Sequence, residues 1–347
     1  MHKKNPDGTL KELHPPSGGP WGGTFVDENY IKWLTEMFGE ATMKQFKDDS
    51  MDDFIDMLRE FEMQKKHIFS DKQDVVVFKI YLSLLECHEK SGDETIATKI
   101  VRMNLSEDVK IKKKCKLHVS ANIVRSWFHG PIDNTVRHIT SILSEEATKE
   151  VSTILLVGGF GECELAQETI RKAVSPRTVV IPADASLAVL KGAVLFGHQP
   201  RLITSRRMKY TYGFSAAVSF DASKHPPEKM AVDSYGDIKV DHGFVKVVSK
   251  GTTVDLYKEI KIENVVLDKR LNNELNIFAS TEQDPVFTTD PSCMYIGKLE
   301  LGPAPGETEA ENKVDICFTF GDTELKARVV ILQTGKVLED VIDCRLV

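Results

Sequence analysis

Three glycines, at positions 158, 159 and 161, have the type and spacing most suggestive of chemistry in this chain. They follow the apolar run 154–157 and precede a segment, 164–174, with helical periodicity. Glycine has no Cβ, so a strand, glycine turn and helix in this order let a nucleotide lie against the backbone. The spacing is neither the dinucleotide fingerprint nor a P-loop. A tight turn without a ligand is therefore an equal alternative.

The elements that position this turn alternate between strands and helices. Residues 154–157 predict a buried strand in a sheet covered on both faces. Residues 178–181 predict a second strand. Helices are expected over 121–129, 131–144 and 185–196, with Asp184 as a helix cap and Gly192 packed closely against a neighbour. The segment 115–197 therefore has an α/β pattern.

The N-terminal residues predict a hairpin followed by a glycine-rich loop and a helix. The hairpin turns at residues 6–8, and the loop at 15–24 suggests either backbone approach to a ligand or rigid packing. Asp27 is suited to cap the next helix, whose apolar stripe predicts core: Tyr30, Trp33, Leu34, Met37 and Phe38. Further along, Glu62 and Lys66 are four residues apart, which favours a solvated ion pair on a helix.

The composition is that of an ordinary globular protein. Hydrophobic residues make up 41% and charged residues 28% of the 347 residues. No run reaches the ~18 apolar residues of a membrane helix, and no signal peptide is expected. The six cysteines are far apart and form no metal or disulfide pattern. A cytoplasmic location without membrane association fits best.

The charge distribution argues against nucleic acid as a partner. The net charge is −7. The basic run at 110–116 is flanked by acidic residues such as Glu107 and Asp108, and no aromatic residues are interleaved with it. A solvated strand edge, which lysines protect from aggregation, is the favoured interpretation.

Beyond residue 198 the hydrophobic period becomes two. Short alternating segments at 275–279, 314–320 and 325–331 are separated by turn signals. Regular short strands of this kind predict an antiparallel β-sandwich.

As a set, several motifs resemble the seventy-kilodalton heat-shock chaperone family, and more narrowly its divergent 12A/12B branch. The motifs are Leu10-Lys-Glu-Leu-His14, Gly18-Gly-Pro-Trp-Gly-Gly-Thr24, Leu155-Leu-Val-Gly-Gly-Phe160, Leu190-Lys-Gly-Ala-Val-Leu-Phe-Gly197, Tyr212-Gly, Lys224-His-Pro-Pro-Glu-Lys229 and Phe320-Gly-Asp-Thr-Glu-Leu325. They span nearly the whole chain.

The resemblance implies an α/β actin-like ATPase lobe, partial here, followed by an all-β domain. Residues 1–197 would be the second lobe and part of the hinge, residues 198–213 a linker, and residues 214–347 a β-sandwich substrate-binding-type domain without the helical lid. Lys250-Gly-Thr-Thr-Val254, Ile296-Gly-Lys-Leu-Glu-Leu301 and Pro303-Ala-Pro-Gly306 match that domain in order. The chain resembles an N-terminally truncated member.

The resemblance also implies a weak or partial site for ATP or ADP, with Mg²⁺ only alongside the nucleotide. Gly158, Gly159 and Phe160 would approach the adenosine side. Glu62, Lys65 and Lys66 match the helix that flanks adenine and ribose. Gly22 and Gly23 match a glycine pair near the phosphates, and Asp184 lies near the second hinge segment. No catalytic residue and no separate metal site are expected.

Two departures from the family pattern limit the expected activity. The main branch has an arginine beside adenine where Glu162 stands, and a glutamate cannot make that cation–π contact. The two phosphate loops and the catalytic lysine have no counterpart, so little remains to hold the metal or orient water. Little or no ATP hydrolysis is expected.

Two functions follow from these observations. One is a stress-response chaperone that binds ATP or ADP and holds client peptide or protein in its β-sandwich, the two sites being coupled. The alternative is a nucleotide-independent protein-interaction module, a truncated paralogue. In either case the open lobe is expected to expose a sheet edge and apolar helix faces and to favour self-association.

Overall fold

The structure is a computed structural model, and it describes the chain in two units. The described residues are 1–69, 74–92, 94–113, 115–267, 274–302, 308, 312–321 and 324–343. Residues 17–198 form the helical unit, and residues 1–16 together with 199–347 form the strand unit. The predicted domain limits at 197 and 213 remain predictions. Residues 1–16, which the prediction grouped with the nucleotide-binding lobe, make their contacts in the strand unit.

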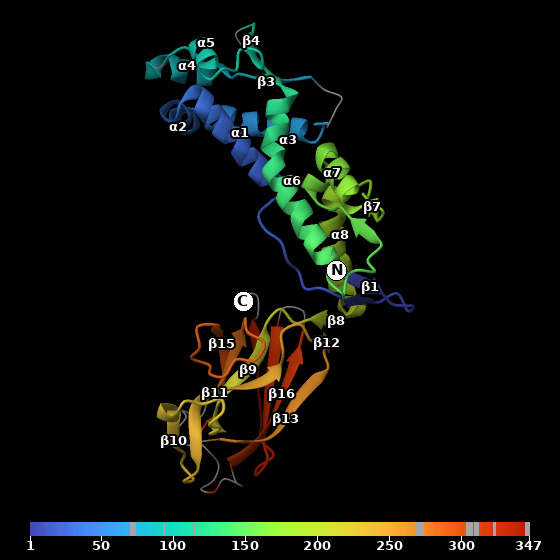
Figure 1. The fold of residues 1–347 in the computed structure, drawn as a ribbon, viewed down its shortest axis with the longest axis vertical. Coiled ribbons are helices and arrows are strands. Elements are labelled where there is room, and N and C mark those ends of the chain that lie inside the picture. Colours follow the sequence, from blue (N-terminus) through green and yellow to red (C-terminus); the bar gives the residue numbers. More distant parts are fainter. Residues whose placement is uncertain are drawn as a thin grey trace. The chain divides into compact units, whose positions relative to one another are not determined.

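The helical unit is a mixed α/β structure (Figure 1). Its elements in chain order are α1 (Gly23–Phe38), α2 (Glu40–Asp49), α3 (Met51–Lys65), β3 (Val75–Lys79), α4 (Leu82–Ser91), α5 (Ile96–Arg102), β4 (Val109–Lys112), β5 (Lys116–Ser120), α6 (Ala121–Leu143), β6 (Thr153–Leu155), the short 3₁₀ helix η1 (Gly159–Glu162), α7 (Glu164–Val174), β7 (Thr178–Val180) and α8 (Ala185–His198). Strands β3, β5 and β4 form an antiparallel sheet in that order.

An aromatic cluster fills the core of the helical unit. Tyr30 of α1 stacks on Phe61 of α3 with ring centroids 4.1 Å apart, and both rings contact Phe78 of β3 and Trp127 of α6. All five residues of the predicted stripe on α1 are buried. The core prediction for this helix is therefore confirmed, since the aromatic period of α1 matches one buried helical face.

Helix α6 corrects the prediction of two helices separated before Pro131. The helix is continuous from Ala121 to Leu143 with Pro131 inside it. A proline has no N–H, so the carbonyl four residues earlier, that of Trp127, loses its helical donor. The side chain of Asn29 on α1 replaces it, because its Nδ2 donates to the Trp127 carbonyl oxygen at 2.8 Å. This bond compensates for the proline and lets the helix continue.

We expect Asn29→Ala to lower the free energy of unfolding by about 1–2 kcal/mol, because it leaves the half-buried Trp127 carbonyl without a donor. Chemical denaturation of the full chain measures the change. Asn134→Ala on α6 is the matched control, since the hydrogen bond of the Asn134 side chain with Arg137 is exposed. Equal stabilities of the two variants would contradict the role given to Asn29.

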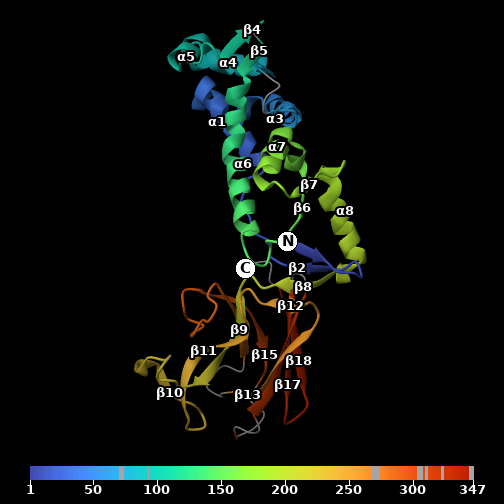
Figure 2. The ribbon, with the colours of Figure 1, turned by 45° about the vertical axis from the view of Figure 1, so that its right-hand side comes forward.

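Strand β6 is less covered than predicted. It pairs in parallel with β7 alone, and no third strand joins this sheet among the described residues (Figure 2). Leu155 is 63% and Val157 44% exposed, so the prediction of a sheet covered on both faces is wrong. The expected close packing at Gly192 in α8 is also wrong, because a Cβ there would meet nothing within 4 Å. Several apolar side chains of α8 are exposed in the same way: Leu187, Val189, Leu190, Val194 and Leu195.

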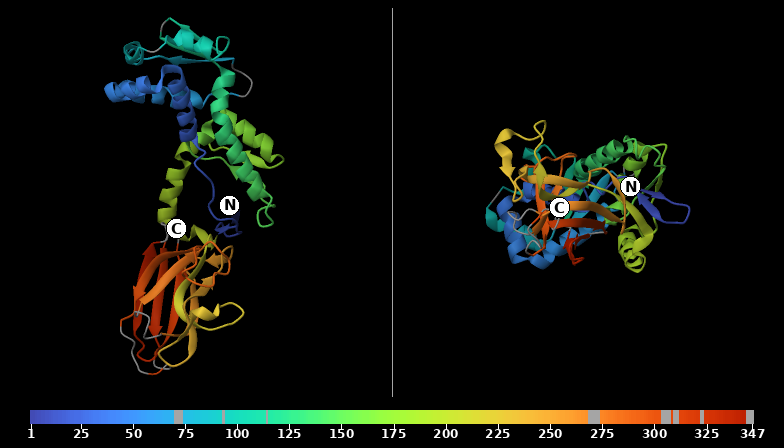
Figure 3. Two further views of the ribbon diagram at one scale, coloured as in Figure 1. Left: turned by 60° about the vertical axis from the view of Figure 1, so that its left-hand side comes forward. Right: turned by 90° about the horizontal axis from the view of Figure 1, so that it is seen from below.

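The strand unit consists of mainly antiparallel sheets and short 3₁₀ turns, with one parallel pair between β2 and β8 (Figure 3). Its elements are β1 (His2–Lys4), β2 (Leu10–Glu12), η2 (Pro200–Leu202), β8 (Ile203–Arg207), β9 (Thr211–Ser219), η3 (Pro227–Lys229), β10 (Met230–Val232), β11 (Ile238–Val248), β12 (Thr253–Asp255), β13 (Glu259–Val266), β14 (Glu274–Ser280), β15 (Cys293–Glu300), β16 (Lys313–Phe320), β17 (Glu324–Ile331) and β18 (Val337–Asp343). Residues 198–213, predicted as a linker, contribute β8 and the beginning of β9.

Two sheets of this unit share one apolar core. One has the order β10–β11–β9–β14–β15 and the other the order β13–β16–β17–β18. Phe214 of β9 and Phe318 of β16 stack with ring centroids 6.1 Å apart, and both are buried. The alternation predicted from the sequence at 275–279, 314–320 and 325–331 therefore corresponds to strands with a buried face.

The predicted N-terminal hairpin is confirmed. Strands β1 and β2 pair antiparallel around the turn at residues 6–8, and β2 pairs in parallel with β8. Some quoted sequences lie outside the described residues. These are the motif at 303–306, the central residues 322–323 of the motif at 320–325, Lys114 of the basic run, and Cys344.

Candidate nucleotide site

Four elements of the helical unit meet around the glycine turn. Gly23 begins α1, and a Cβ built there would lie 3.1 Å from Lys65 Nζ on α3 and 3.8 Å from Phe160 on η1. Gly158 donates its backbone N–H to the carbonyl of Ala185 at the start of α8, at 2.7 Å. The N-terminus of α1, the C-terminus of α3, the glycine turn and the N-terminus of α8 are therefore neighbours. Most of the predicted site residues lie on these four elements.

Lys65 is held in place by protein groups. Its ammonium donates to both carboxylate oxygens of Asp27, at 2.8 and 2.9 Å, and to the Gly23 carbonyl at 3.4 Å, and it pairs with Glu62. An ammonium has three donors, and these three groups use them. Lys65 is only 5% exposed. In this arrangement it positions the start of α1 and leaves no donor free for a ligand.

These contacts correct two expectations. Asp27 does not cap α1, because Gly22 occupies the N-cap position and the Asp27 carboxylate is turned to Lys65. Glu62 pairs with Lys65, three residues away, and not with Lys66. Burial raises the pKa of Asp27, although Lys65 opposes that shift. The sequence could not show this, because Asp27 and Lys65 are 38 residues apart.

Lys66 belongs to a second polar group, which joins three elements. Its Nζ lies 2.9 Å from Glu162 Oε2 at the end of η1, and Glu162 Oε1 accepts the backbone N–H of Ser186 on α8 at 3.1 Å. Hydrogen bonds from Ser186, followed by the Lys66 ammonium, lower the pKa of Glu162 to about 2. The Glu162 bond to Lys66 likewise raises the pKa of Lys66. Glu162 therefore connects the glycine turn to α3 and α8, a role its sequence position did not suggest.

The glycines of the site leave open space. A Cβ at Gly22, Gly158 or Gly159 would meet nothing within 4 Å. Gly158 also has φ +84°, a backbone conformation that side chains rarely adopt. Gly161 differs, because a Cβ there would lie 3.3 Å from the Leu156 backbone, so its role is local packing. Bare backbone facing open space is the property that a ligand lying against the main chain requires.

The remaining predicted residues lie near this space. The Asp184 carboxylate, immediately before α8, pairs with Lys191 of that helix, which lowers the pKa of Asp184. Behind the turn, a cavity of about 220 Å³ is lined mainly by apolar side chains. Its lining includes Ile132, Leu155, Phe160, Ala166 and Ile170. Phe160 therefore contributes to the wall of this cavity as well as to the contact with Gly23.

The Glu162 contacts predict an acid-dependent part of the stability. The folded pKa of Glu162, about 2, lies below its ordinary value of 4.5, so the stabilisation is present above about pH 4.5 and is lost as the pH falls toward 2. Glu162→Gln should therefore cost most at pH 6 and progressively less as the pH falls from 4.5 toward 2. Thermal unfolding of both proteins across this range measures it. A penalty that is constant with pH would contradict the ion pair, and Glu146→Gln, at an exposed pair with Lys149, is the control.

Comparison with known proteins finds relatives among the heat shock 70 kDa proteins. It is 30% identical over 343 residues to heat shock 70 kDa protein 12A of Mus musculus and of Homo sapiens, which covers 97% of this chain. It is 29% identical over 351 residues to human heat shock 70 kDa protein 12B. The chain is a homologue of the heat shock 70 kDa protein 12A/12B branch. The resemblance inferred from the motifs is thereby confirmed.

The homology to the 12A/12B branch covers nearly all of this chain but only part of each relative. The chain spans about half the length of the curated relatives it matches. No protein-family model matches it. Across the described residues, no helix is long and apolar enough to cross a membrane, and no cluster of three potential metal-ligating side chains is found.

Proposed function

We propose that this 12A/12B homologue binds an adenine nucleotide, ATP or ADP, at the glycine turn of its helical unit. The observation that carries the proposal is the open backbone at Gly159, next to Gly158 and at the meeting point of four elements. Gly158, Gly159 and Phe160 would contact the adenosine, and Gly22 with Gly23 would lie toward the phosphates. Under this proposal residues 17–198 have the actin-like fold, and the strand unit is the family's β-sandwich.

The residues of this site are suited to binding a nucleotide but not to catalysing its hydrolysis. The start of α1 favours an anion, because its N-cap residue Gly22 makes no side-chain capping bond and no acidic residue lies in the first turn. Lys65 on α3 holds the start of α1 through its bonds to Asp27 and the Gly23 carbonyl. The ion pair of Lys66 with Glu162 sets the distance between α3 and the glycine turn. A nucleotide would bring its Mg²⁺ with it. We propose little or no hydrolysis, because phosphoryl transfer needs cationic groups at the β- and γ-phosphates and Lys65 is committed to Asp27.

Nucleotide in this site would bias the grip of the strand unit on a client peptide or protein, as a coupling between two sites. We also propose a cytoplasmic location and no nucleic-acid partner.

Isothermal titration of ATP into the full chain tests binding, and release of inorganic phosphate tests hydrolysis. Saturable heat without phosphate release supports the proposal. Binding heat together with rapid phosphate release would contradict the proposal and would mean that the protein hydrolyses ATP.

A nucleotide-independent interaction module is the second candidate. The observation that favours it is the exposed apolar surface on β6, β7 and α8, which includes Leu155, Val157 and Val180. Surfaces of this kind mark interaction sites or promote self-association. Sedimentation velocity with a dye for apolar surface tests this candidate. A sharp monomer that binds no dye would exclude self-association through this surface.

A further inference from the structure

The exposed face of the β3–β5–β4 sheet carries an unusual concentration of positive charge. Alternation along the strands puts one set of side chains in the core and the other set outside. The outer set contains the exposed lysines Lys79, Lys110, Lys112 and Lys116 together with His118, Val75 and Val77. We name this set the basic face. Part of this face, the basic run at 110–116, was predicted to be a solvated strand edge, and β4 is an edge strand.

The pairing register places these lysines side by side. Lys116 of β5 lies opposite both Lys79 of β3 and Lys112 of β4. Lys110 lies opposite His118, two residues along. Burial, followed by the charges of Lys112 and Lys116, lowers the pKa of His118, as expected where cations gather. Lys79 lies over the Tyr81 ring, 4.1 Å from its centroid. For Lys110, Lys112 and Lys116, no ion pair to a carboxylate is found within the described part of the chain.

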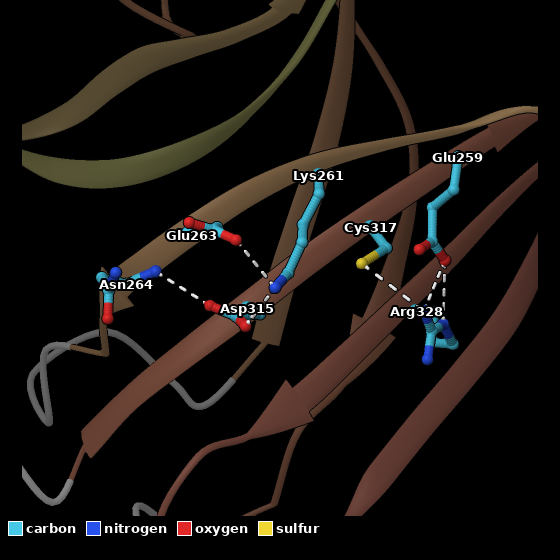
Figure 4. A network of polar contacts seen from close by, with 7 residues as sticks. All are labelled: Glu259, Lys261, Glu263, Asn264, Asp315, Cys317 and Arg328. Carbon is cyan, nitrogen blue, oxygen red and sulfur yellow. Dashed lines mark hydrogen bonds and ion pairs between the residues drawn. The ribbon is translucent and has the colours of Figure 1, made fainter.

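On a sheet of the strand unit, by contrast, basic side chains form ion pairs with carboxylates on the same sheet. On β13, β16 and β17, Lys261 lies 2.8 Å from Asp315 and 2.9 Å from Glu263, and Arg328 lies 2.5 Å from Glu259 (Figure 4). Lys261 and Arg328 therefore each have a carboxylate neighbour. Like charges opposite each other on a sheet are destabilising. The basic face retains that unfavourable arrangement in a protein whose net charge is −7.

We propose that the basic face binds an extended acidic segment of a partner protein. Lysines at alternate positions of a strand are about 6.6–6.8 Å apart, which is also the spacing of same-side residues in an extended peptide. Carboxylates at alternate positions of the partner would therefore meet Lys110 and Lys112 along β4. A single nucleic-acid strand fits less well, since the outer set has no Phe, Tyr or Trp ring on which a base could stack, and its imidazole, that of His118, is partly buried between lysines.

The test uses the full chain and a fluorescent peptide of alternating glutamate and valine. We expect saturable binding in fluorescence polarisation that weakens with salt, because surface charges are screened within about 8 Å at 0.15 M ionic strength. The double variant Lys110→Glu with Lys112→Glu should bind at least about tenfold more weakly, since two attractive contacts become repulsive. The double variant with arginine at both positions should retain binding.

The matched control is Lys3→Glu with Lys4→Glu. It makes the same change in net charge on two exposed strand residues of the strand unit. An equal loss of binding in this control would overturn the proposal, because the attraction would then be general. So would the absence of peptide binding by the folded wild type, or tighter binding of an oligouridine of similar length. Should the glutamate variant fail to fold, Lys112→Gln with the same peptide decides the question, and unchanged affinity overturns the proposal.

Discussion

Gly159→Val is expected to weaken nucleotide binding by about 10- to 100-fold, while the stability of the protein stays close to that of wild type. A Cβ at this position would meet no protein atom within 4 Å, so the substitution creates no clash inside the protein. The new side chain would occupy the space in which the proposed nucleotide lies against the backbone. Isothermal titration with ADP measures the affinity, and thermal unfolding measures the stability.

Gly159 gives a cleaner test than its neighbour Gly158. The φ of Gly158 is +84°, so a side chain there would strain the backbone whether or not a ligand binds. Gly192→Val on α8 is the matched control, because its Cβ also meets nothing within 4 Å but lies away from the turn. If Gly159→Val bound ADP as tightly as the control does, the nucleotide would not lie at this turn.

Lys65→Met is expected to lower the free energy of unfolding by about 3–5 kcal/mol, the range for breaking a buried ion pair from one side. Methionine keeps the length and the buried apolar stem of the side chain but removes its charge. The half-buried Asp27 carboxylate then loses its counter-ion, and the Gly23 carbonyl loses a donor. Chemical denaturation gives the loss in stability.

The pH dependence of Lys65→Met identifies the cause. Burial already raises the pKa of Asp27, and loss of Lys65 raises it further. A carboxyl group with a raised folded pKa stabilises the protein at low pH, and this contribution is lost as the pH rises through that pKa. The penalty should therefore be larger at pH 8 than at pH 5. Replacing Asp27 by asparagine as well should recover part of it.

Lys261→Met is the control for burial. Lys261 also pairs with two carboxylates, Glu263 and Asp315, but its side chain is 42% exposed. Exposed pairs contribute about 0–1 kcal/mol. If Lys65→Met and Lys261→Met lowered the free energy of unfolding by similar amounts, burial of the Lys65–Asp27 pair would not add to its contribution to stability.

The sequence predicted the features that depend on local pattern. The stripe on α1, the N-terminal hairpin and the alternating strands of the strand unit follow from periodicity and turn residues, and the structure confirms them. Short-range physical rules determine these features, and they are visible in a single chain. The grouping of residues 22–23, 62–66 and 158–160 followed instead from the resemblance to the family, and their role as a nucleotide site stays a prediction.

Features that depend on distant partners could not be predicted. Pro131 was expected to begin a helix, and no local pattern indicates that Asn29, 98 residues away from Trp127 along the chain, supplies the missing donor to the Trp127 carbonyl. Lys65 was predicted to contact the nucleotide, but its ammonium forms an ion pair with Asp27. The residues at 154–157 have the composition of a buried strand, yet burial also needs neighbouring strands. Apolar composition alone does not provide them.

The most direct measurement of the central claim is calorimetric titration of ADP and ATP into the folded full chain. The claim is that bare backbone at Gly158 and Gly159 receives an adenine nucleotide whose phosphates are not split. The expected result is saturable one-site heat for both nucleotides, lost in Gly159→Val and retained in Gly192→Val. A folded protein that gives no heat with either nucleotide would contradict the claim.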